Sequence, residues 1–425
     1  MKKIPFLFLV LFLFSCASKT AFKQQEDLIC IQIVDRNGID ETISSKERLA
    51  KYKNTNFLDS QPYQQVIQIF DLKKSEKKTS KITTYHDNGL IWQYLEIVNS
   101  RAFGMYREWH KNGQLAIEAT VIGGPADTAL SSQKDWIFDE VCKAWDENGN
   151  LLSIFNYEKG LLEGNSQYFH PNGKIEKIEN YSKNELTGEV IHYNETGEII
   201  LKSNYLKGKK HGRSEGFFEK NKTAFFEEYE NDLLITAKYF DKDGYIFTDI
   251  FEGTGIKAIF TAKKLDKLTE YKNGVVEGKV QIFKKDHLHK VYHIKNGKKE
   301  GEEIEYYPVT TIYNKDKNKQ KLSVNWLNDT IQGMVKTWYE NSSQQSQKEY
   351  YQNKKNGISS SWYKDGSLMF VEEYENDILL KGSYYKKGEN IPASTIINGN
   401  GTVTLFDENG NFLQKIKYTK GVAEE

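Results

Sequence analysis

Residues 164–181 read Gly164-Asn-Ser-Gln-Tyr-Phe169-His-Pro-Asn172-Gly173-Lys-Ile-Glu-Lys-Ile-Glu-Asn-Tyr181, and this stretch decides the fold. Its second half alternates apolar and polar residues, which is typical of a strand with one face toward a core. Asn172-Gly173 interrupts the alternation with residues that suit the positive φ angles of tight hairpin turns. The stretch therefore predicts a β-hairpin.

An aromatic residue recurs every twelve positions around this hairpin. One frame contains Trp145, Tyr157, Phe169, Tyr181, Tyr193, Tyr205, Phe217 and Tyr229, and a second frame contains Trp326, Trp338, Tyr350, Trp362 and Tyr374. Only 13% of all residues are aromatic, so runs of this length do not arise by chance. Alternate members of each frame differ in their surroundings, which makes the true repeat 24 residues long. One strand and one turn fill twelve residues, so we expect tandem hairpins that pair edge to edge.

Two further stretches match a known repeat closely. Residues 104–115 read Gly104-Met-Tyr-Arg-Glu-Trp109-His-Lys-Asn-Gly113-Gln-Leu115, and residues 333–341 read Gly333-Met-Val-Lys-Thr-Trp338-Tyr-Glu-Asn341. Both resemble the unit of the MORN-repeat-variant family, and the resemblance extends from about residue 81 to the C-terminus. It implies an all-β fold, an elongated antiparallel sheet of tandem β-hairpins. It implies little about function, because unrelated proteins use such repeats as scaffolds.

The first part of the chain does not repeat and predicts a small α+β cap over residues 26–80. We expect strands at 28–34 and 66–70, a turn at Asn37-Gly38 and a short capped helix from Ser44 to Tyr52. The hairpin repeats then fill residues 81–425, with insertions near 122–142, 240–268, 308–322 and 386–400. Each insertion is either a tolerated interruption or a binding loop.

The N-terminus predicts export. Lys2 and Lys3 precede an apolar run over residues 4–14, which is too short for a permanent transmembrane helix. We interpret residues 1–15 as a signal peptide and residues 16–25 as a tether. Leu13-Phe14-Ser15-Cys16 resembles the bacterial lipobox, and this resemblance implies that Cys16 carries acyl chains that attach the protein to a membrane. Alternatively, the signal peptide is an ordinary one and Cys16 is incidental. Ala17, in place of an aspartate, favours the outer membrane of a bacterial envelope.

Candidate chemical sites are few. His287, His289 and His293 share one face of a strand, but about 13 Å of extended chain separates the last two. Two fragments, Asp241-Lys-Asp243-Gly244 and Asp316-Lys-Asn318, resemble parts of calcium loops and lack the remaining ligands. No catalytic motif is present, so we expect no metal, no cofactor and no enzyme activity.

Two cysteines and three histidines can be interpreted as structural residues. Cys30 and Cys142 either form a disulfide in the export compartment or remain two buried thiols. His86, His110 and His170 share one repeat position before a turn, and we interpret them as exposed residues that flank the turns.

The expected function is that of a lipid-anchored envelope module that binds or scaffolds a protein partner. The 59 basic and 59 acidic side chains give no net charge, which argues against a nucleic-acid partner. Two alternatives remain: an antitoxin-like inhibitor, since some proteins with these repeats are labelled antitoxins, and a carbohydrate-binding module. Trp338 and Trp362 are the candidate binding residues, and we expect at least one of them to be partly exposed. Tyr193, inside the unbroken array, is expected to pack between neighbouring rings.

Overall fold

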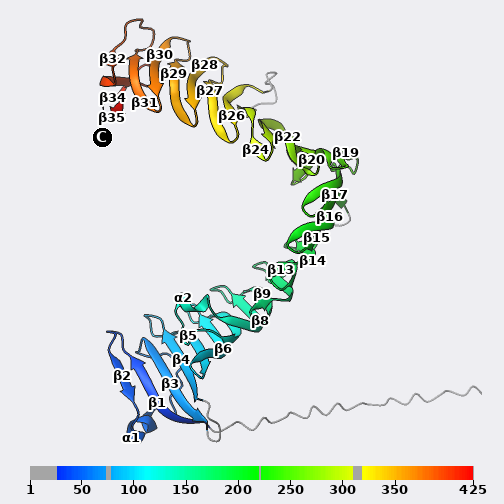
Figure 1. Ribbon diagram of the computed structural model, residues 1–425, viewed down its shortest axis with the longest axis vertical. Coiled ribbons are helices and arrows are strands. Elements are labelled where there is room, and N and C mark those ends of the chain that lie inside the picture. The colour runs from blue at the N-terminus through cyan, green and yellow to red at the C-terminus, as the bar shows by residue number, and fades with distance from the viewer. Residues whose placement is uncertain (1–25, 73–77, 220–221, 310–317, 425) are drawn as a thin grey trace, which may run out of the picture. The chain divides into compact units, whose positions relative to one another are not determined.

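The fold was obtained as a computed structural model, which describes residues 26–72, 78–219, 222–309 and 318–424 (Figure 1). Nearly every described segment is a strand, and the strands pair in antiparallel fashion with their neighbours along the chain. The predicted all-β repeat fold is therefore confirmed. The chain divides into two compact units, Met1–Glu163 and Gly164–Glu425, which are described separately below. No helix in the described part of the chain is long and apolar enough to cross a membrane.

The first unit begins with the predicted cap. Its strands are β1 (Glu26–Val34), β2 (Asp40–Ile43), β3 (Gln65–Leu72), β4 (Lys78–Tyr85), β5 (Ile91–Val98), β6 (Arg101–Trp109), β7 (Leu115–Gly123), β8 (Ile137–Trp145), β9 (Leu151–Glu158) and β10 (Leu161–Leu162). β1 pairs with both β2 and β3, and each strand from β3 to β8 pairs with the next.

Short helical segments complete the cap. The expected helix is α1 (Lys46–Leu49) followed by a 3₁₀ turn (Ala50–Tyr52), and Ser45 occupies the N-cap position without a side-chain capping bond. A second helix of one turn, α2 (Leu130–Gln133), lies in the segment between β7 and β8. Leu49 and Phe57 pack with buried side chains of β1 to β3, which gives the first edge of the array its own small core.

The second unit continues the hairpins. Its strands are β11 (Gly164–Phe169), β12 (Ile175–Ser182), β13 (Glu185–Leu186), β14 (Gly188–Tyr193), β15 (Ile199–Leu206), β16 (Lys209–Glu219), β17 (Lys222–Glu230), β18 (Leu233–Phe240), β19 (Ile246–Phe251), β20 (Thr254–Thr261), β21 (Lys264–Lys272), β22 (Val275–Lys284), β23 (His287–Lys295), β24 (Lys298–Lys299) and β25 (Gly301–Tyr306). They continue with β26 (Gln320–Leu327), β27 (Thr330–Trp338), β28 (Gln344–Tyr351), β29 (Lys354–Trp362), β30 (Leu368–Glu375), β31 (Ile378–Tyr384), β32 (Ser394–Ile397), β33 (Asn400–Phe406), β34 (Phe412–Thr419) and β35 (Val422–Ala423).

Two kinds of turn alternate along the array. In the turn at Asn172-Gly173 only the glycine has positive φ, +79°, and a register shift follows Tyr168, which is the geometry of a type I turn with a bulge. The opposite turns have positive φ at both central residues, as in Lys207 (+50°) and Gly208 (+77°). The interpretation of Asn-Gly as a pair of positive-φ residues is therefore wrong for Asn172, because the extra bulge residue changes the turn type.

Successive turns are also bonded to each other. On the two-residue side, the backbone N–H of Gly208 donates to the carbonyl of Leu186 at 2.8 Å, and Asp377 repeats this with Lys355 at 2.9 Å. On the bulged side, Nε2 of His170 donates to the carbonyl of Tyr193 at 3.0 Å. Hairpins with these bonds are thereby held to a neighbour at their turns as well as along the strands.

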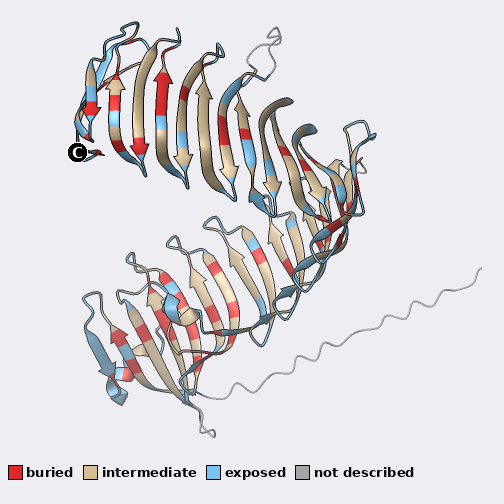
Figure 2. Cartoon of the chain, turned by 45° about the horizontal axis from the view of Figure 1, so that its top comes forward, coloured by how far each residue is buried: buried red, intermediate tan, exposed pale blue. Residues whose placement is uncertain are grey.

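Most side chains of the array are half-buried, and fully buried residues occur on some of the described strands and not on others (Figure 2). A single layer of sheet leaves much of each face open to water, unlike two packed layers. Tyr193, which was expected to pack between neighbouring rings, is accordingly half-buried. Continuous cores form only in local clusters, such as those around Leu95 and Tyr106 and around Leu234 and Tyr239.

Three of the four interrupted regions contain described structure that can be compared with the repeat. Residues 122–142 contain α2, and residues 240–268 contain β19, β20 and the start of β21, so hairpins continue where the aromatic frame is lost. Residues 386–400 contain a loop followed by β32. The fourth region, 308–322, lies partly outside the described residues.

Candidate functional site

The segment between β7 and β8 is a compact structure and walls a cleft of the first unit. Trp136 is buried, and its Nε1 donates to the carbonyl of Pro125 at 3.0 Å. Its ring meets Tyr106 edge to face with centroids 4.8 Å apart. An edge-to-face contact stabilises more than the buried area alone, so the base of the segment is held firmly on β6.

Gln93 ties the same segment to the sheet. Its side chain is 2% exposed, and its Oε1 accepts a hydrogen bond from Oγ1 of Thr84 at 3.0 Å. Its Nε2 donates to the carbonyl of Thr128 at 3.1 Å, and Nε2 of Gln133 donates to the same carbonyl at 3.1 Å. Because a buried amide without partners is costly, this network fixes where the backbone at Thr128 lies.

Asp127 has a structural role at the start of α2. Its Oδ1 accepts a hydrogen bond from the backbone N–H of Ala129 at 2.9 Å, and its Oδ2 accepts one from Oγ of Ser132 at 2.8 Å. Both carboxylate oxygens are therefore engaged within the segment. Asp127 therefore shapes the cleft wall.

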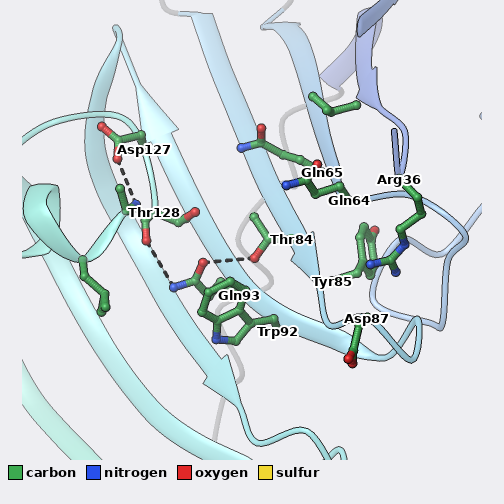
Figure 3. A pocket seen from close by; sticks show the side chains of 13 residues that line it. Arg36, Gln64, Gln65, Thr84, Tyr85, Asp87, Trp92, Gln93, Asp127 and Thr128 are labelled. Carbon is green, nitrogen blue, oxygen red and sulfur yellow. Dashed lines mark hydrogen bonds between the residues drawn. The ribbon is translucent and has the colours of Figure 1, made fainter. Parts of the chain in front are cut away.

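The cleft itself has a volume of about 640 Å³ and lies between this segment and the cap (Figure 3). Its floor crosses three neighbouring strands, because Gln65 pairs in register with Thr84 and Thr84 pairs with Gln93. Gln64 lies beside Gln65, and the exposed side chain of Leu130 forms part of the opposite wall. The surface thus combines free amide groups with an apolar rim, which is a combination suited to binding an extended polar chain.

Charges around the cleft are mostly committed. Asp87 pairs with Nζ of Lys111 at 2.8 Å, and this hydrogen bond lowers the pKa of Asp87. Arg36 donates from Nε to the carbonyl of Pro62 at 3.3 Å and has no acidic partner among the described residues. Tyr85 is buried and donates to the carbonyl of Phe57 at 2.8 Å, and burial raises its pKa to about 12. One guanidinium is left to attract an anionic group of a ligand.

The residues predicted from sequence are not brought to this cleft. Trp338 and Trp362 belong to the second unit, where both are half-buried and end strands β27 and β29. Their backbone carbonyls accept hydrogen bonds from the hydroxyls of Tyr307 and Tyr339, at 2.6 and 2.9 Å. Both indoles are thus partly exposed, as expected of at least one. Cys16, the predicted signal peptide and the tether lie outside the described residues.

The histidines of the turns were interpreted wrongly as exposed. His86, His110 and His170 are half-buried, and Nε2 of each donates to the carbonyl of an aromatic residue in the next turn, at 2.9, 2.9 and 3.0 Å. A carbonyl can only accept, so Nε2 must carry the proton. The signal for this role was present in the sequence, since each histidine directly follows an aromatic frame residue.

The other candidate groups can be placed as follows. His287, His289 and His293 lie on β23, and among the described residues no three possible metal ligands are gathered into one group. Oδ1 of Asp241 accepts the backbone N–H groups of Asp243 and Tyr245, at 2.9 and 3.0 Å, which makes it a turn residue. Asp316 lies outside the described residues.

The two cysteines among the described residues are unpaired. Cys30 and Cys142 are both free thiols and both half-buried. Burial raises the pKa of Cys142 to about 11, so its thiol stays protonated at neutral pH.

Sequence reasoning missed a buried carboxylate in the second unit. Glu227 is 3% exposed, and its carboxylate accepts hydrogen bonds from the hydroxyls of Tyr229 at 2.8 Å and Tyr239 at 2.7 Å. Nζ of Lys257 lies 2.5 Å from the same carboxylate. Burial by itself raises the pKa of Glu227, but Lys257 and the two hydroxyls outweigh it, so the net pKa lies below the ordinary 4.5.

The same cluster occurs a second time. Residues 225–234 read FFEEYENDLL and residues 370–379 read FVEEYENDIL, an offset of 145 positions. Glu372 accepts hydrogen bonds from Tyr374 at 3.1 Å and Tyr384 at 2.8 Å, as Glu227 does from its two tyrosines. This recurrence is the signal that could have revealed the clusters from sequence.

The comparisons with known proteins agree with the repeat geometry. The MORN repeat variant family matches residues 141–159 and 162–183. These residues are similar to MORN repeat variants. They include the frame positions Trp145, Tyr157, Phe169 and Tyr181 and the hairpin strands β9 to β12. The comparison with curated proteins found no match.

Proposed function

We propose that this chain is a lipid-anchored protein of the bacterial envelope, favouring the outer membrane, whose hairpin repeats form a protein-binding scaffold. The MORN-variant repeats and the open single-layer array support a scaffold or binding module. The lipid anchor rests on Cys16 and the apolar run before it. A repeat array of this kind offers a large surface with little enclosed volume, which suits macromolecules better than small molecules.

The observation that carries the proposal is the fixed wall of the cleft. An inserted segment that merely interrupts a sheet needs no buried amide network, yet Gln93 and Gln133 both bond the carbonyl of Thr128. Preorganisation of this kind lowers the entropy lost on binding. The free amides of Gln64 and Gln65 are placed to bond the backbone of an extended segment of a protein partner.

A carbohydrate ligand is the second candidate. Trp92, 37% exposed, lines the cleft together with amide side chains, and this combination also suits sugar hydroxyls and ring faces. An antitoxin-like role would make the partner a toxin protein, so it differs from the main proposal in what is bound and not in the surface used.

Affinity capture from detergent-solubilised envelope tests the cleft. Leu130 is 68% exposed, so Leu130→Asp should fold normally and obstruct the wall. Leu152→Asp, at a residue 45% exposed on β9, is the matched control. We expect a protein captured by the wild type to be lost with Leu130→Asp and kept with Leu152→Asp. A captured glycan would favour the second candidate, and equal capture by both variants would overturn the assignment of the cleft.

Mass spectrometry of the native N-terminus tests the anchor. We expect the mature chain to begin at Cys16 and to carry acyl chains, because more than one chain is needed for stable attachment. Cleavage at another residue, or an unacylated Cys16, would contradict the anchor without affecting the cleft.

A further inference from the structure

The second unit has a cleft where two neighbouring strands separate. β23 is paired with β25 from Lys290, which lies opposite Glu305, but β23 itself begins three residues earlier. Residues 287–289 therefore have no strand beside them on this side in the described part of the chain. A cleft of about 490 Å³ lies between these residues and residues 307–309, which follow the end of β25. We refer to it as the basic cleft.

Four basic side chains line the basic cleft, and no acidic side chain among the described residues does. Lys284 and Lys285 are exposed, and neither forms an ion pair with a described residue. His287 pairs in register with Lys284, which puts these two side chains on the same face of the hairpin. His289, like His287, is half-buried. The cleft thus has two positive charges without a partner and two imidazoles beside them.

The carboxylates near the basic cleft are engaged by other lysines. Glu305 pairs with Lys321 at 3.0 Å and with Lys290 at 3.7 Å. Asp286, in the turn between Lys285 and His287, lies 4.0 Å from Nζ of Lys264. The charges of Lys284 and Lys285 are therefore available to an anionic ligand.

His289 responds to the charges around it. Burial lowers its pKa below the ordinary 6.5, and the charge of Lys284 lowers the pKa further. Glu305 opposes this effect, while Lys290 and Lys321 add to it. The imidazole is therefore mainly neutral at pH 7, so one ring nitrogen can donate a hydrogen bond to a ligand. A bound anion would raise this pKa, because it favours the protonated imidazole.

The opposite wall of the basic cleft is apolar and fixed in place. It consists of Tyr307, Pro308 and Val309. The backbone N–H of Tyr307 donates to the carbonyl of Lys319 at 2.9 Å, and its hydroxyl donates to the carbonyl of Trp338 at 2.6 Å. Both polar groups of Tyr307 are thus engaged away from a ligand, and its ring is left to contact an apolar group.

We propose that the basic cleft binds a small soluble phosphate monoester whose organic part is apolar. Such an ester has a charge of about −1.5 to −2 at pH 7, which matches the two lysines without a partner, whereas a carboxylate would leave one of them unmatched. Lysine is a common phosphate ligand, and the cleft volume is within the range of small-molecule sites. The basic cleft shares no residue with the cleft of the first unit, so this site is independent of the proposed partner binding.

Calorimetric titration of the full chain with phenyl phosphate tests the site. Lys284→Gln removes one of the two charges, and Lys295→Gln, at an exposed lysine near the other end of β23, is the matched control. We expect Lys284→Gln to weaken the affinity about tenfold, because a charge-assisted hydrogen bond is lost, and Lys295→Gln to leave it unchanged. Equal affinities in all three proteins, or no binding by the wild type, would overturn the proposal. Melting curves check that each variant remains folded.

The imidazole NMR signals of the histidines locate the bound phosphate. At pH 7 phenyl phosphate should move the Cε1–H signal of His289 toward its protonated position, and phenol, which lacks the phosphate, should not. His293, which is exposed farther along β23 and does not line the cleft, is the internal reference. Equal movement of the His289 and His293 signals would contradict the site. A response to vesicles that contain phosphatidic acid, without one to phenyl phosphate, would overturn the assignment to a small soluble ligand.

Discussion

Glu227, which is buried, and Glu372, which is half-buried, show how a carboxylate at matching positions can be neutralised in two ways. Both bond two tyrosine hydroxyls, and in each cluster a lysine lies over a tyrosine ring, Lys210 at 4.8 Å from Tyr229 and Lys355 at 4.5 Å from Tyr374. The second lysine differs. Lys257 reaches Glu227 from β20, whereas the matching residue of β33 is Val403, which is buried and apolar.

A lysine appears instead on the other side of the second cluster. Lys348 pairs in register with Ser359, which pairs with Glu372, and the matching residue in the first cluster is Ser203. Burial lowers the pKa of Lys348, and the charge of Glu372 partly opposes this. Each cluster thus contains one carboxylate and two lysines, although the lysines come from different strands.

Replacement of Glu227 should lower the free energy of unfolding strongly. Glu227→Ala leaves Lys257 without its partner in a buried place, and breaking such a pair costs about 3–5 kcal/mol. Glu372→Ala removes the hydrogen bonds from Tyr374 and Tyr384, so we expect a smaller loss of about 1–3 kcal/mol. Urea denaturation of both variants measures the difference, and equal losses would contradict the stabilising role of the Lys257 pair.

The same carboxylate predicts sensitivity to acid. The pKa of Glu227 is lowered from 4.5 in the folded chain, so its contribution to stability is complete above that pH and is lost as the pH falls through the folded value. The melting temperature of the wild type should therefore fall more steeply between about pH 5 and pH 3 than that of Glu227→Gln. Parallel curves for the two proteins would count against this explanation.

For Trp338 and Trp362, the effect of a substitution on stability can be measured separately from its effect on partner binding. Both indoles are half-buried, so Trp338→Ala and Trp362→Ala should lower the melting temperature modestly. If either ring contacts a partner, its variant should also lose partner capture while still folded. Tyr193→Ala is the control, with a half-buried frame residue elsewhere in the array. Lower melting temperatures with normal capture would assign both tryptophans to the core.

At the scale of the hairpin, the two turn types explain which part of the repeat could be predicted. Period-two alternation and turn residues are local signals, so the strands and the cap elements were predictable from neighbouring residues alone. The bond from His170 to Tyr193 depends on the next hairpin, so its partner could not be read from neighbouring residues, although the position of the histidine directly after an aromatic frame residue was a signal for it. The cleft is less predictable still, because Gln65 and Thr128 meet through separate parts of the first unit.

Two turn glycines provide a matched test of this element. Gly208 has φ +77°, and no atom lies within 4 Å of the place that an alanine Cβ would take, so Gly208→Ala should cost only the strain of positive φ, about 1–2 kcal/mol. Gly253 has φ +72°, and its added Cβ would lie 2.4 Å from the backbone nitrogen of Gly274. Gly253→Ala should therefore lower the free energy of unfolding by roughly 1–3 kcal/mol more than Gly208→Ala does, because the neighbouring turn must move.

Thermal or chemical unfolding of the two alanine variants measures this comparison. The backbone N–H of Gly274 donates to the carbonyl of Gly253 at 2.9 Å, so hydrogen exchange at Gly274 should also speed up in Gly253→Ala alone. Similar decreases in the free energy of unfolding of both variants would show that the turns at Gly253 and Gly274 can separate without much cost.

For the whole molecule, the tandem hairpin repeats of the sequence predict an extended particle. A compact domain of 425 residues would have a radius of gyration of about 22 Å. An array of hairpins buries less surface against itself, so we expect small-angle scattering to give a clearly larger value. A value near 22 Å would contradict the prediction of an elongated molecule.

The turn-to-turn bonds bear on how such a chain reaches its folded state. Gly208 bonds a residue 22 positions earlier, and Lys263 and Glu219, at 44 positions apart, are among the more distant pairs. Contacts of such short range make folding fast, because little loop-closure entropy is lost before each contact forms. A chain that crosses a membrane from its N-terminus could then fold hairpin by hairpin as it emerges, with each completed hairpin serving as the template for the next.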